Sequence, residues 1–367
     1  MSDAATRVLD DAFLEIVADW RNGGPGCDEA RFDAQALALY AYQLERNEPY
    51  RRFAKSLGYG NGRRPASWRE IPAVPASAFK DAILATFDAA RAELVFATSG
   101  TTAERTGKHY VEHARLYDAS LLAGFDRFML PDRPKLRYLN LVPNVRSRPQ
   151  SSLGYMMAHV SVLRGDGKAA YFLDGDAVDA AGFARALDAA IAERQAVCIA
   201  GTAFAFATLL EELGRGERSF AAPAGSRIME TGGFKGRARV VERAALYAAL
   251  SATLGIPEAS IVAEYGMTEL LSQYYDAPAA RAQAIRVKVA PPWLRPLVVD
   301  AGGREVPAGE IGFLRHQDLA NRSSAIAIET EDRGYRTPDG IVLLGRDADA
   351  PLRGCSLDAE DLAAPRG

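Results

Sequence analysis

A run of hydroxyl, glycine and lysine residues is the segment of this chain best suited to hold phosphate groups. Thr98–Lys108 contains five hydroxyl side chains, two glycines and one lysine in eleven residues, directly after the apolar run Leu94–Ala97. Such a loop offers backbone N–H groups, O–H donors and a cation to a triphosphate. It is not a Walker A loop, because its glycine spacing differs and a predicted strand, not a helix, follows it. An exposed hairpin tip is the alternative for this composition.

A second group of polar residues follows the predicted strand Ser260–Glu264. The segment Glu264–Glu269 brings an aromatic ring, a hydroxyl and a carboxylate to the end of that strand. Tyr265 offers a face to a base, Thr268 a hydroxyl to a phosphate, and Glu269 an oxygen ligand to Mg²⁺. An ordinary turn after a strand is the alternative.

Charged residues near the C-terminal end form a third candidate. Asp332 ends the segment Thr330–Asp332, and Arg346 follows the predicted strand Ile341–Leu344. A carboxylate able to bridge two ribose hydroxyls, together with an arginine, suits a nucleoside contact. Two charged turns are the alternative.

Paired glycines form the fourth candidate. Gly232 and Gly233 stand between the predicted strand Arg227–Met229 and a predicted helix. Glycines let a flat ring approach the backbone closely, because they carry no Cβ. A turn that enters a helix is the alternative.

Composition excludes several other classes of protein. The chain has 367 residues, with 44 basic and 47 acidic side chains and a net charge of −3, so it offers no reason to expect nucleic acid as a partner. The sequence has no apolar run of about 18 residues, the length a membrane-spanning helix needs, and no secretory leader pattern. We therefore expect a cytoplasmic protein without a membrane span. Three scattered cysteines and four histidines show no spacing typical of a disulfide framework or a structural metal site.

The elements that must position these residues alternate between strand and helix. Apolar runs predict strands at Leu94–Ala97, Tyr138–Val142, Ala196–Ala200 and Ser260–Glu264, and helical periodicity predicts helices at Ala177–Arg194, Ala203–Leu213 and Arg239–Leu254. The first 60 residues are predicted to be helical, and Ile71–Pro75 is predicted to be extended. After Pro291 the pattern changes to short strands with glycine turns, which predicts a small β-rich subdomain. The fold class is therefore α/β with layered sheets.

Taken in order, the four motifs resemble those of the adenylate-forming superfamily, which includes acyl-CoA synthetases and adenylation domains. Thr98–Lys108 is similar to its TSGTTGxPK signature, Glu264–Glu269 to YGxTE, and Thr330–Asp332 with Gly345-Arg346 to TGD and GR. Within the superfamily the chain most resembles LuxE-type acyl-protein synthetases. The segments that carry this resemblance are Ile71–Lys80, Thr98–Lys108, Thr231–Lys235, Asp318–Asn321 and Arg353–Leu357. A more distant resemblance is to phenylacetate-CoA ligases.

The sequence departs from the superfamily pattern in three places. Glu331 replaces the glycine of TGD, and Ala103–Arg105 lengthen the loop. Only 21 residues follow Arg346, where typical members carry a mobile C-terminal domain with a catalytic lysine. We therefore expect that domain to be absent, with residues 1–345 forming the adenylate-forming domain and residues 346–367 a short tail. Within residues 1–345 we expect a helical part over about 1–90 and the β-rich subdomain over about 291–345.

The resemblance implies ATP-dependent activation of a carboxylic acid, most simply a fatty acid, with ATP and Mg²⁺ as cofactors. Glu269 is implied as the Mg²⁺ ligand, and Thr268 as the α-phosphate contact. The remaining nucleotide-binding residues implied are Thr98, Ser99, Gly100, Thr101, Thr102 and Lys108 for the phosphates, Asp332 and Arg346 for the ribose, and Gly232, Gly233, Tyr265 and Gly266 around the adenine. Lys235 is our candidate for the missing lysine, and a structural lysine is the alternative.

The resemblance also implies an acyl acceptor. LuxE-type proteins carry an acylated cysteine near the C-terminus, and Cys355 matches that position. The final acceptor is expected to be a protein, a reductase or a carrier, or else CoA. An acid-CoA ligase and an inactive partner subunit with the same fold are the two alternative functions. The apolar segment Ile199–Phe206 is expected either to line an acyl pocket or to pack in the core.

Overall fold

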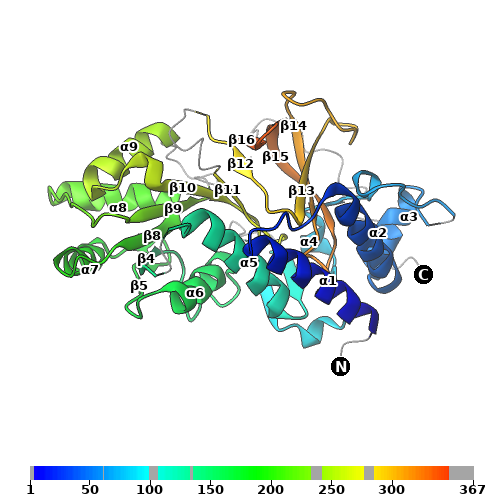
Figure 1. Cartoon of the computed structure of the whole chain (residues 1–367), viewed down its shortest axis with the longest axis horizontal. Coiled ribbons are helices and arrows are strands. Elements are labelled where there is room, and N and C mark those ends of the chain that lie inside the picture. Colours follow the sequence, from blue (N-terminus) through cyan, green and yellow to red (C-terminus); the bar gives the residue numbers. More distant parts are fainter. Residues whose placement is uncertain are drawn as a thin grey trace. The chain divides into compact units, whose positions relative to one another are not determined.

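The computed structural model describes residues 4–60, 62–98, 106–132, 135–232, 242–276 and 285–346 (Figure 1). Two compact units make up the chain. Unit 1 comprises Met1–Ala123, Met267–Gln273 and Ala290–Gly367, and unit 2 comprises Gly124–Gly266 and Tyr274–Val289. Both combine strands and helices, so the predicted α/β fold class is confirmed.

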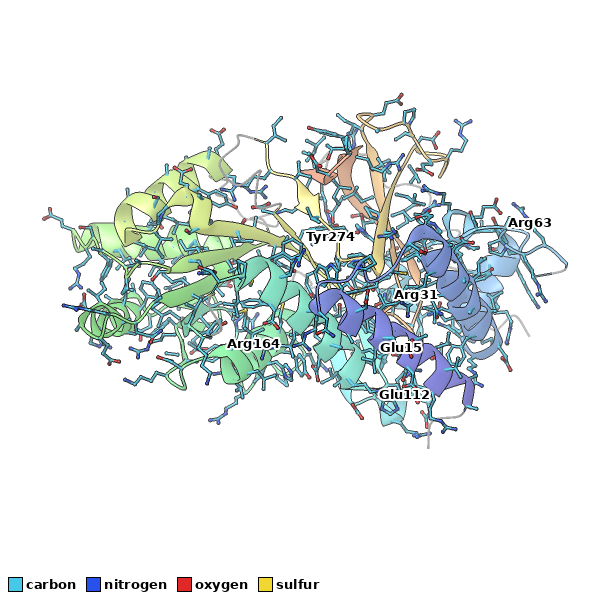
Figure 2. The ribbon with its side chains drawn as sticks, in the orientation of Figure 1. Glu15, Arg31, Arg63, Glu112, Arg164 and Tyr274 are labelled. Atoms are coloured by element: carbon cyan, nitrogen blue, oxygen red, sulfur yellow. The ribbon has the colours of Figure 1, made fainter. Side chains whose placement is uncertain are left out.

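Unit 1 begins with helices. They are α1 (Ala4–Arg21), α2 (Glu29–Arg46), α3 (Glu48–Ser56) and α4 (Ala78–Asp81), with short 3₁₀ turns at Trp68–Glu70 and Ala89–Arg91. Asp28 caps α2 by accepting a hydrogen bond from the backbone N–H of Arg31 at 2.7 Å, which satisfies a donor that the helix itself leaves unpaired. The guanidinium of Arg31 also lies 3.4 Å from the Glu15 carboxylate of α1, so the two helices meet through this surface pair (Figure 2).

The strands of unit 1 form a sheet and a separate hairpin. The sheet has the order β13 (Leu294–Val299), β14 (Gly312–Asp318), β15 (Ala327–Thr337) and β16 (Gly340–Arg346), all antiparallel, and β1 (Val74–Pro75) pairs with β15 in parallel. The hairpin joins β2 (Leu94–Ala97) to β3 (Lys108–Val111). The extended connector and the β-rich part after Pro291 were therefore predicted correctly.

Unit 2 is built on a mainly parallel sheet. Its strands follow the order β5 (Ala170–Tyr171), β4 (Arg137–Leu141), β8 (Val197–Thr202), β9 (Arg227–Thr231) and β10 (Ile261–Tyr265), all parallel, then β11 (Tyr274–Asp276) and β12 (Lys288–Val289), which are antiparallel. A short hairpin pairs β6 (Leu173–Asp174) with β7 (Ala177–Val178). Strands β4, β8 and β9 are almost completely buried, as expected when helices cover both faces of a parallel sheet.

Helices lie on both faces of that sheet. Leu139 and Leu141 of β4 belong to the core formed with α7 (Ala180–Ala192), α8 (Ala203–Arg215) and α9 (Arg243–Leu254). Asn140, which alternates with them, donates a hydrogen bond to Ser161 of α6 (Ser152–Arg164) at 3.2 Å. Figure 1 accordingly shows α8 and α9 on one side of the strands and α6 on the other. Helix α5 (Ala114–Met129) begins in unit 1 and ends in unit 2.

One predicted helix begins later than its composition suggested. The prediction Ala177–Arg194 included Ala177 and Val178, which form strand β7. Asp179 then caps α7 by accepting a hydrogen bond from the backbone N–H of Gly182 at 2.8 Å, so the helix begins at Ala180. Within the described part of the chain, no helix is both long enough and apolar enough to cross a membrane.

Candidate functional site

The base of the Ser/Thr/Gly loop is held by strands β2 and β3. Thr98 and Gly107 form two hydrogen bonds across it, from Thr98 N to Gly107 O and from Gly107 N to Thr98 Oγ1, both at 2.9 Å. Lys108 is exposed at the start of β3. Ser99, Gly100, Thr101 and Thr102 lie outside the described residues, so the structure defines the two ends of the loop.

Gly107 lies so close to the backbone of α4 that a larger residue there would require a small shift of that backbone. A Cβ at this position would lie 3.2 Å from the carbonyl carbon of Phe79 and 3.3 Å from the amide nitrogen of Lys80. The ring of Phe79 also meets the imidazole of His109 edge to face, with 5.4 Å between ring centroids. The Phe79-Lys80 pair, which contributed to the family resemblance, therefore packs against the strand that follows the loop.

Thr268 and Glu269 form a turn that contacts this same strand. His109 Nδ1 lies 2.9 Å from the carbonyl oxygen of Thr268, and Leu270 N donates to Met267 O at 3.2 Å. The Glu269 residue is buried, with 7% of its surface exposed. The structure thus brings the predicted Mg²⁺ and α-phosphate residues to the strand that carries Lys108.

The hydrogen-bond partners of His109 determine which ring nitrogen carries the proton. A carbonyl oxygen can only accept, so Nδ1 carries the proton, and Nε2 accepts from the Ser324 hydroxyl at 2.9 Å. Burial lowers the pKa of His109 to about 4, and the hydrogen bond to Thr268 opposes that effect only in part. The ring is therefore neutral at pH 7.

Residues 318–324 form a buried turn that holds the other side of the Thr268–Glu269 segment. Asn321 Nδ2 donates to Glu269 O at 2.9 Å, and its Oδ1 accepts from Leu271 N at 3.0 Å. Asp318 accepts from Ser272 Oγ at 2.7 Å and from Leu271 N at 3.1 Å. Burial raises the pKa of Asp318 to about 6, although these hydrogen bonds oppose the shift. Asp318–Asn321 was part of the family resemblance, and the structure gives it this anchoring role.

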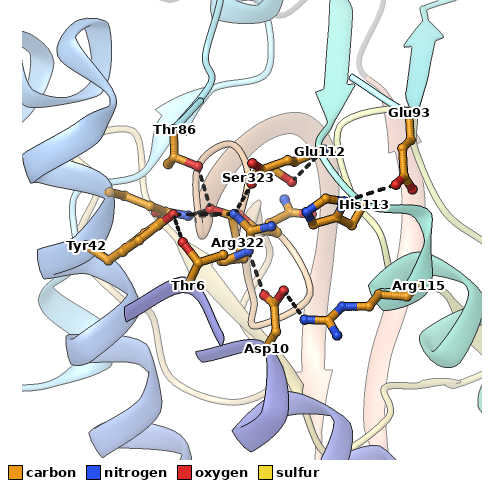
Figure 3. A network of polar contacts seen from close by, with 12 residues as sticks. Thr6, Asp10, Tyr42, Thr86, Glu93, Glu112, His113, Arg115, Arg322 and Ser323 are labelled. Carbon is orange, nitrogen blue, oxygen red and sulfur yellow. Dashed lines mark hydrogen bonds and ion pairs between the residues drawn. The ribbon is translucent and has the colours of Figure 1, made fainter. Parts of the chain in front are cut away.

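Arg322 fixes that turn to two further elements of unit 1 (Figure 3). Its guanidinium pairs with Asp10 of α1 at 2.6 Å and with Glu112, directly after β3, at 2.7 Å. Arg115 pairs with Asp10 as well, at 2.6 Å. Sequence analysis missed Arg322, because its partners are distant in the chain and no local pattern surrounds it.

The predicted ribose residues meet at the end of the unit 1 sheet. Asp332 and Arg346 are paired positions on β15 and β16, and Arg346 Nε donates to Asp332 Oδ1 at 2.8 Å. Glu331, which replaces the glycine of the TGD motif, lies in β15 without a positive φ. The backbone there therefore does not require glycine, and the substitution leaves the position of Asp332 in the strand unchanged.

In unit 2 the predicted adenine residues follow two neighbouring parallel strands. Gly232 follows β9 with a left-handed backbone (φ 65°), and Tyr265 ends β10 with Gly266 directly after it. Thr231 and Glu264, paired across the strands, share a hydrogen bond from the threonine hydroxyl to the carboxylate. The carboxyl ends of neighbouring parallel strands are where α/β sheets bind ligands. Gly233 and Lys235 lie outside the described residues.

The described cysteines are poor nucleophiles. Burial raises the pKa of Cys27 to about 11 and that of Cys198 to about 12, which disfavours the reactive thiolate in both. Cys355 lies outside the described residues. Ile199, Ala205 and Phe206 pack in the unit 2 core, as the packing interpretation of Ile199–Phe206 requires.

Comparison with known proteins identifies the family. The family model described as acyl-protein synthetase, LuxE, matches residues 27–358. This chain belongs to the LuxE acyl-protein synthetase family. A comparison with curated proteins by sequence gives no match.

Solved structures share the fold of this LuxE family member. An open conformation of 2-hydroxyisobutyryl-CoA ligase with 2-HIB-AMP and CoA aligns at a TM-score of 0.64 and 17% identity, covering 89% of this chain and 72% of that one. The McyG A-PCP protein complexed with phenylalanyl-adenylate gives 0.51 and 16%, covering 80% and 51%. ATP-bound MatB from Rhodopseudomonas palustris gives 0.50 and 19%, covering 70% and 48%. The chain thus spans about half the length of MatB and McyG, and its fold is that of adenylate-forming enzymes.

Proposed function

We propose that this protein activates a carboxylic acid, most simply a fatty acid, as an acyl-adenylate and passes the acyl group to a thiol. The observation that carries the proposal is the anchoring of the Thr268–Glu269 turn to strand β3, beside Lys108 and the base of the Ser/Thr/Gly loop. Family membership and the Asp332–Arg346 pair support it. In the first step a carboxylate oxygen attacks the α-phosphorus of ATP, the bond from that phosphorus to the bridging oxygen breaks, and pyrophosphate leaves.

Positioning and charge neutralisation supply most of the catalysis of such a displacement. We assign the β- and γ-phosphates to Lys108 and the loop hydroxyls, and the α-phosphate to Thr268. Asp332 and Arg346 are proposed to bind the ribose. Gly232, Gly233, Tyr265 and Gly266 are proposed to surround the adenine, and Lys235 to neutralise developing charge.

The residues present also fit Mg²⁺. Glu269 supplies one hard carboxylate oxygen, directly after Thr268, the residue assigned to the α-phosphate. Mg²⁺ is usually bound through one or two carboxylates together with substrate phosphates, which matches this donor set. When bound, the ion would neutralise charge on the phosphate oxygens, and Glu269 would hold it.

The second step transfers the acyl group to sulfur. A thiolate attacks the acyl carbon, a C–S bond forms, the C–O bond to AMP breaks, and the thiol proton goes to solvent. We propose Cys355 as the first acceptor, because its position matches the family cysteine and the raised pKa of Cys27 and of Cys198 disfavours both as nucleophiles.

Two assays test the proposal. Carboxylic acids of increasing chain length are screened for acid-dependent exchange of labelled pyrophosphate into ATP; no exchange with any acid would reject adenylation. The enzyme is then incubated with ATP and labelled acid and treated with neutral hydroxylamine. Hydroxylamine-labile label that is absent from Cys355→Ser and present in Cys27→Ser and Cys198→Ser supports the thioester. Label that persists in Cys355→Ser rejects it, and product formed only with CoA identifies an acid-CoA ligase.

A further inference from the structure

The carbonyl groups of Thr268 and Glu269 are held from two directions. His109 of β3 binds the first and Asn321 of the 318–324 turn binds the second. Ser324 of that turn binds the other nitrogen of His109, so strand, Thr268–Glu269 turn and 318–324 turn form a closed ring of contacts. His109, Asn321 and Ser324 are completely buried. Water therefore cannot replace any of these partners without a change in packing.

We infer that His109 is a positioning residue for adenylation, which fixes the Thr268–Glu269 turn against the strand that carries Lys108. This inference rests on the proposed function, because it concerns the alignment of the same nucleotide-binding residues. Lys108 and His109 are consecutive, and Thr98 ties the other end of the loop to Gly107. The imidazole is thus a direct link between the strand that follows the loop and the Thr268–Glu269 turn.

The link matters because phosphoryl chemistry is sensitive to small displacements. A misplacement of about 1 Å in a catalytic group costs about a hundredfold in rate. Without the ring, the Thr268 carbonyl loses its donor, while the contacts of the turn with Asn321 and Asp318 remain. Loss of alignment should lower kcat, whereas ATP affinity supplied by the loop should change little.

Replacing His109 with asparagine or glutamine tests the roles of the two ring nitrogens one at a time. The side-chain nitrogen of asparagine lies near the position of Nδ1, so His109→Asn keeps a donor for Thr268. The side-chain amide of glutamine lies near the position of Nε2. His109→Gln therefore keeps a hydrogen-bond partner for Ser324 but loses the donor to Thr268. His113 is the matched control, because it stands four residues away and pairs with Glu93 at the surface, 3.0 Å apart.

The experiment measures pyrophosphate exchange for the full-length wild type, His109→Ala, His109→Gln, His109→Asn and His113→Asn. We expect kcat to fall about a hundredfold in the alanine and glutamine variants, with KM for ATP changed less than about threefold. The kcat of His109→Asn should be at least about tenfold higher than that of His109→Ala, and the kcat of His113→Asn should equal that of the wild type. The inference would be overturned if His109→Ala exchanged pyrophosphate as fast as His113→Asn does. It would also be overturned if His109→Gln and His109→Asn recovered the same kcat.

A spectroscopic measurement tests the contact without activity. Nitrogen-15 correlation spectra of histidine-labelled wild type should show His109 as the neutral tautomer protonated on Nδ1, assigned by its loss in His109→Asn. A ring protonated on Nε2 would overturn the contact with Thr268 even if exchange is active. If the wild type exchanges no labelled pyrophosphate with any acid, the proposed function is rejected. The tautomer of His109 then still tests its hydrogen bond to Thr268 independently of activity.

Discussion

Replacing His109 with asparagine should make unit 1 less sensitive to acid. In the folded chain His109 stays neutral down to a pKa of about 4, whereas the ordinary value is 6.5. The unfolded chain therefore binds a proton between these two pH values that the folded chain does not bind, and lowering the pH destabilises the fold. At about 1.4 kcal/mol for each pH unit below the ordinary pKa of 6.5, the stability lost by about pH 4.5 amounts to ~2.5 kcal/mol.

The asparagine side chain does not titrate, so the variant lacks this loss. It should be less stable than the wild type at pH 7, by about 1–3 kcal/mol, because Ser324 loses a buried partner. Relative to the wild type, the variant should gain ~2.5 kcal/mol of stability as the pH falls to about 4.5, so the deficit should disappear or reverse. His316 is also buried with its pKa lowered to about 4, and it contributes equally to both proteins.

Tryptophan fluorescence provides the assay for this prediction. All three tryptophans, Trp20, Trp68 and Trp293, belong to unit 1, so their emission reports the unit that contains His109. Urea unfolding at each pH gives the free energy of unfolding from the midpoint and slope. If the wild type and His109→Asn lose stability in parallel between about pH 7.5 and pH 4.5, the argument from the buried neutral imidazole is refuted.

Three further substitutions test other parts of the structure. Glu269→Gln should lower pyrophosphate exchange about a hundredfold or more by removing the charge proposed to hold Mg²⁺. Glu310→Gln, at an exposed acid outside the proposed site, is its control, and normal exchange of Glu269→Gln at saturating Mg²⁺ would remove Glu269 from the site. Lys108→Ala should lower kcat/KM for ATP about a hundredfold, measured by steady-state exchange beside Lys168→Ala; unchanged kcat and KM would mean that the loop does not bind the triphosphate. Arg322→Met should cost ~3–5 kcal/mol in urea unfolding, because it leaves the buried carboxylate of Asp10 without this partner; wild-type stability would show that the pair contributes little.

Local sequence determined most of the secondary structure around the candidate site. The bounds predicted for Leu94–Ala97 match β2, the strand predicted after the loop is β3, and the β-rich part after Pro291 was also predicted. Short apolar runs between turn residues specify buried strands from their own composition. The boundary of α7 was missed because it depends on one capping hydrogen bond from Gly182 N to Asp179, which overrides the helical composition before it.

The order of the four motifs also indicated the family, because each motif consists of residue types that are visible in the sequence. The domain division and the roles of the individual site residues stay predictions. Part of the Thr98–Lys108 loop, together with Gly233, Lys235 and Cys355, lies outside the described residues.

Tertiary structure alone decided which residues hold the motifs in place. His109 and Thr268 are 159 positions apart, and Gln43 donates a hydrogen bond to Asn321 O across 278 positions. Arg322 joins α1 to the end of β3 through Asp10 and Glu112. In sequence, Gln43, Asp10 and Arg322 are ordinary polar residues without a local pattern. Their roles come from burial, where a polar group must find a partner wherever the fold brings one.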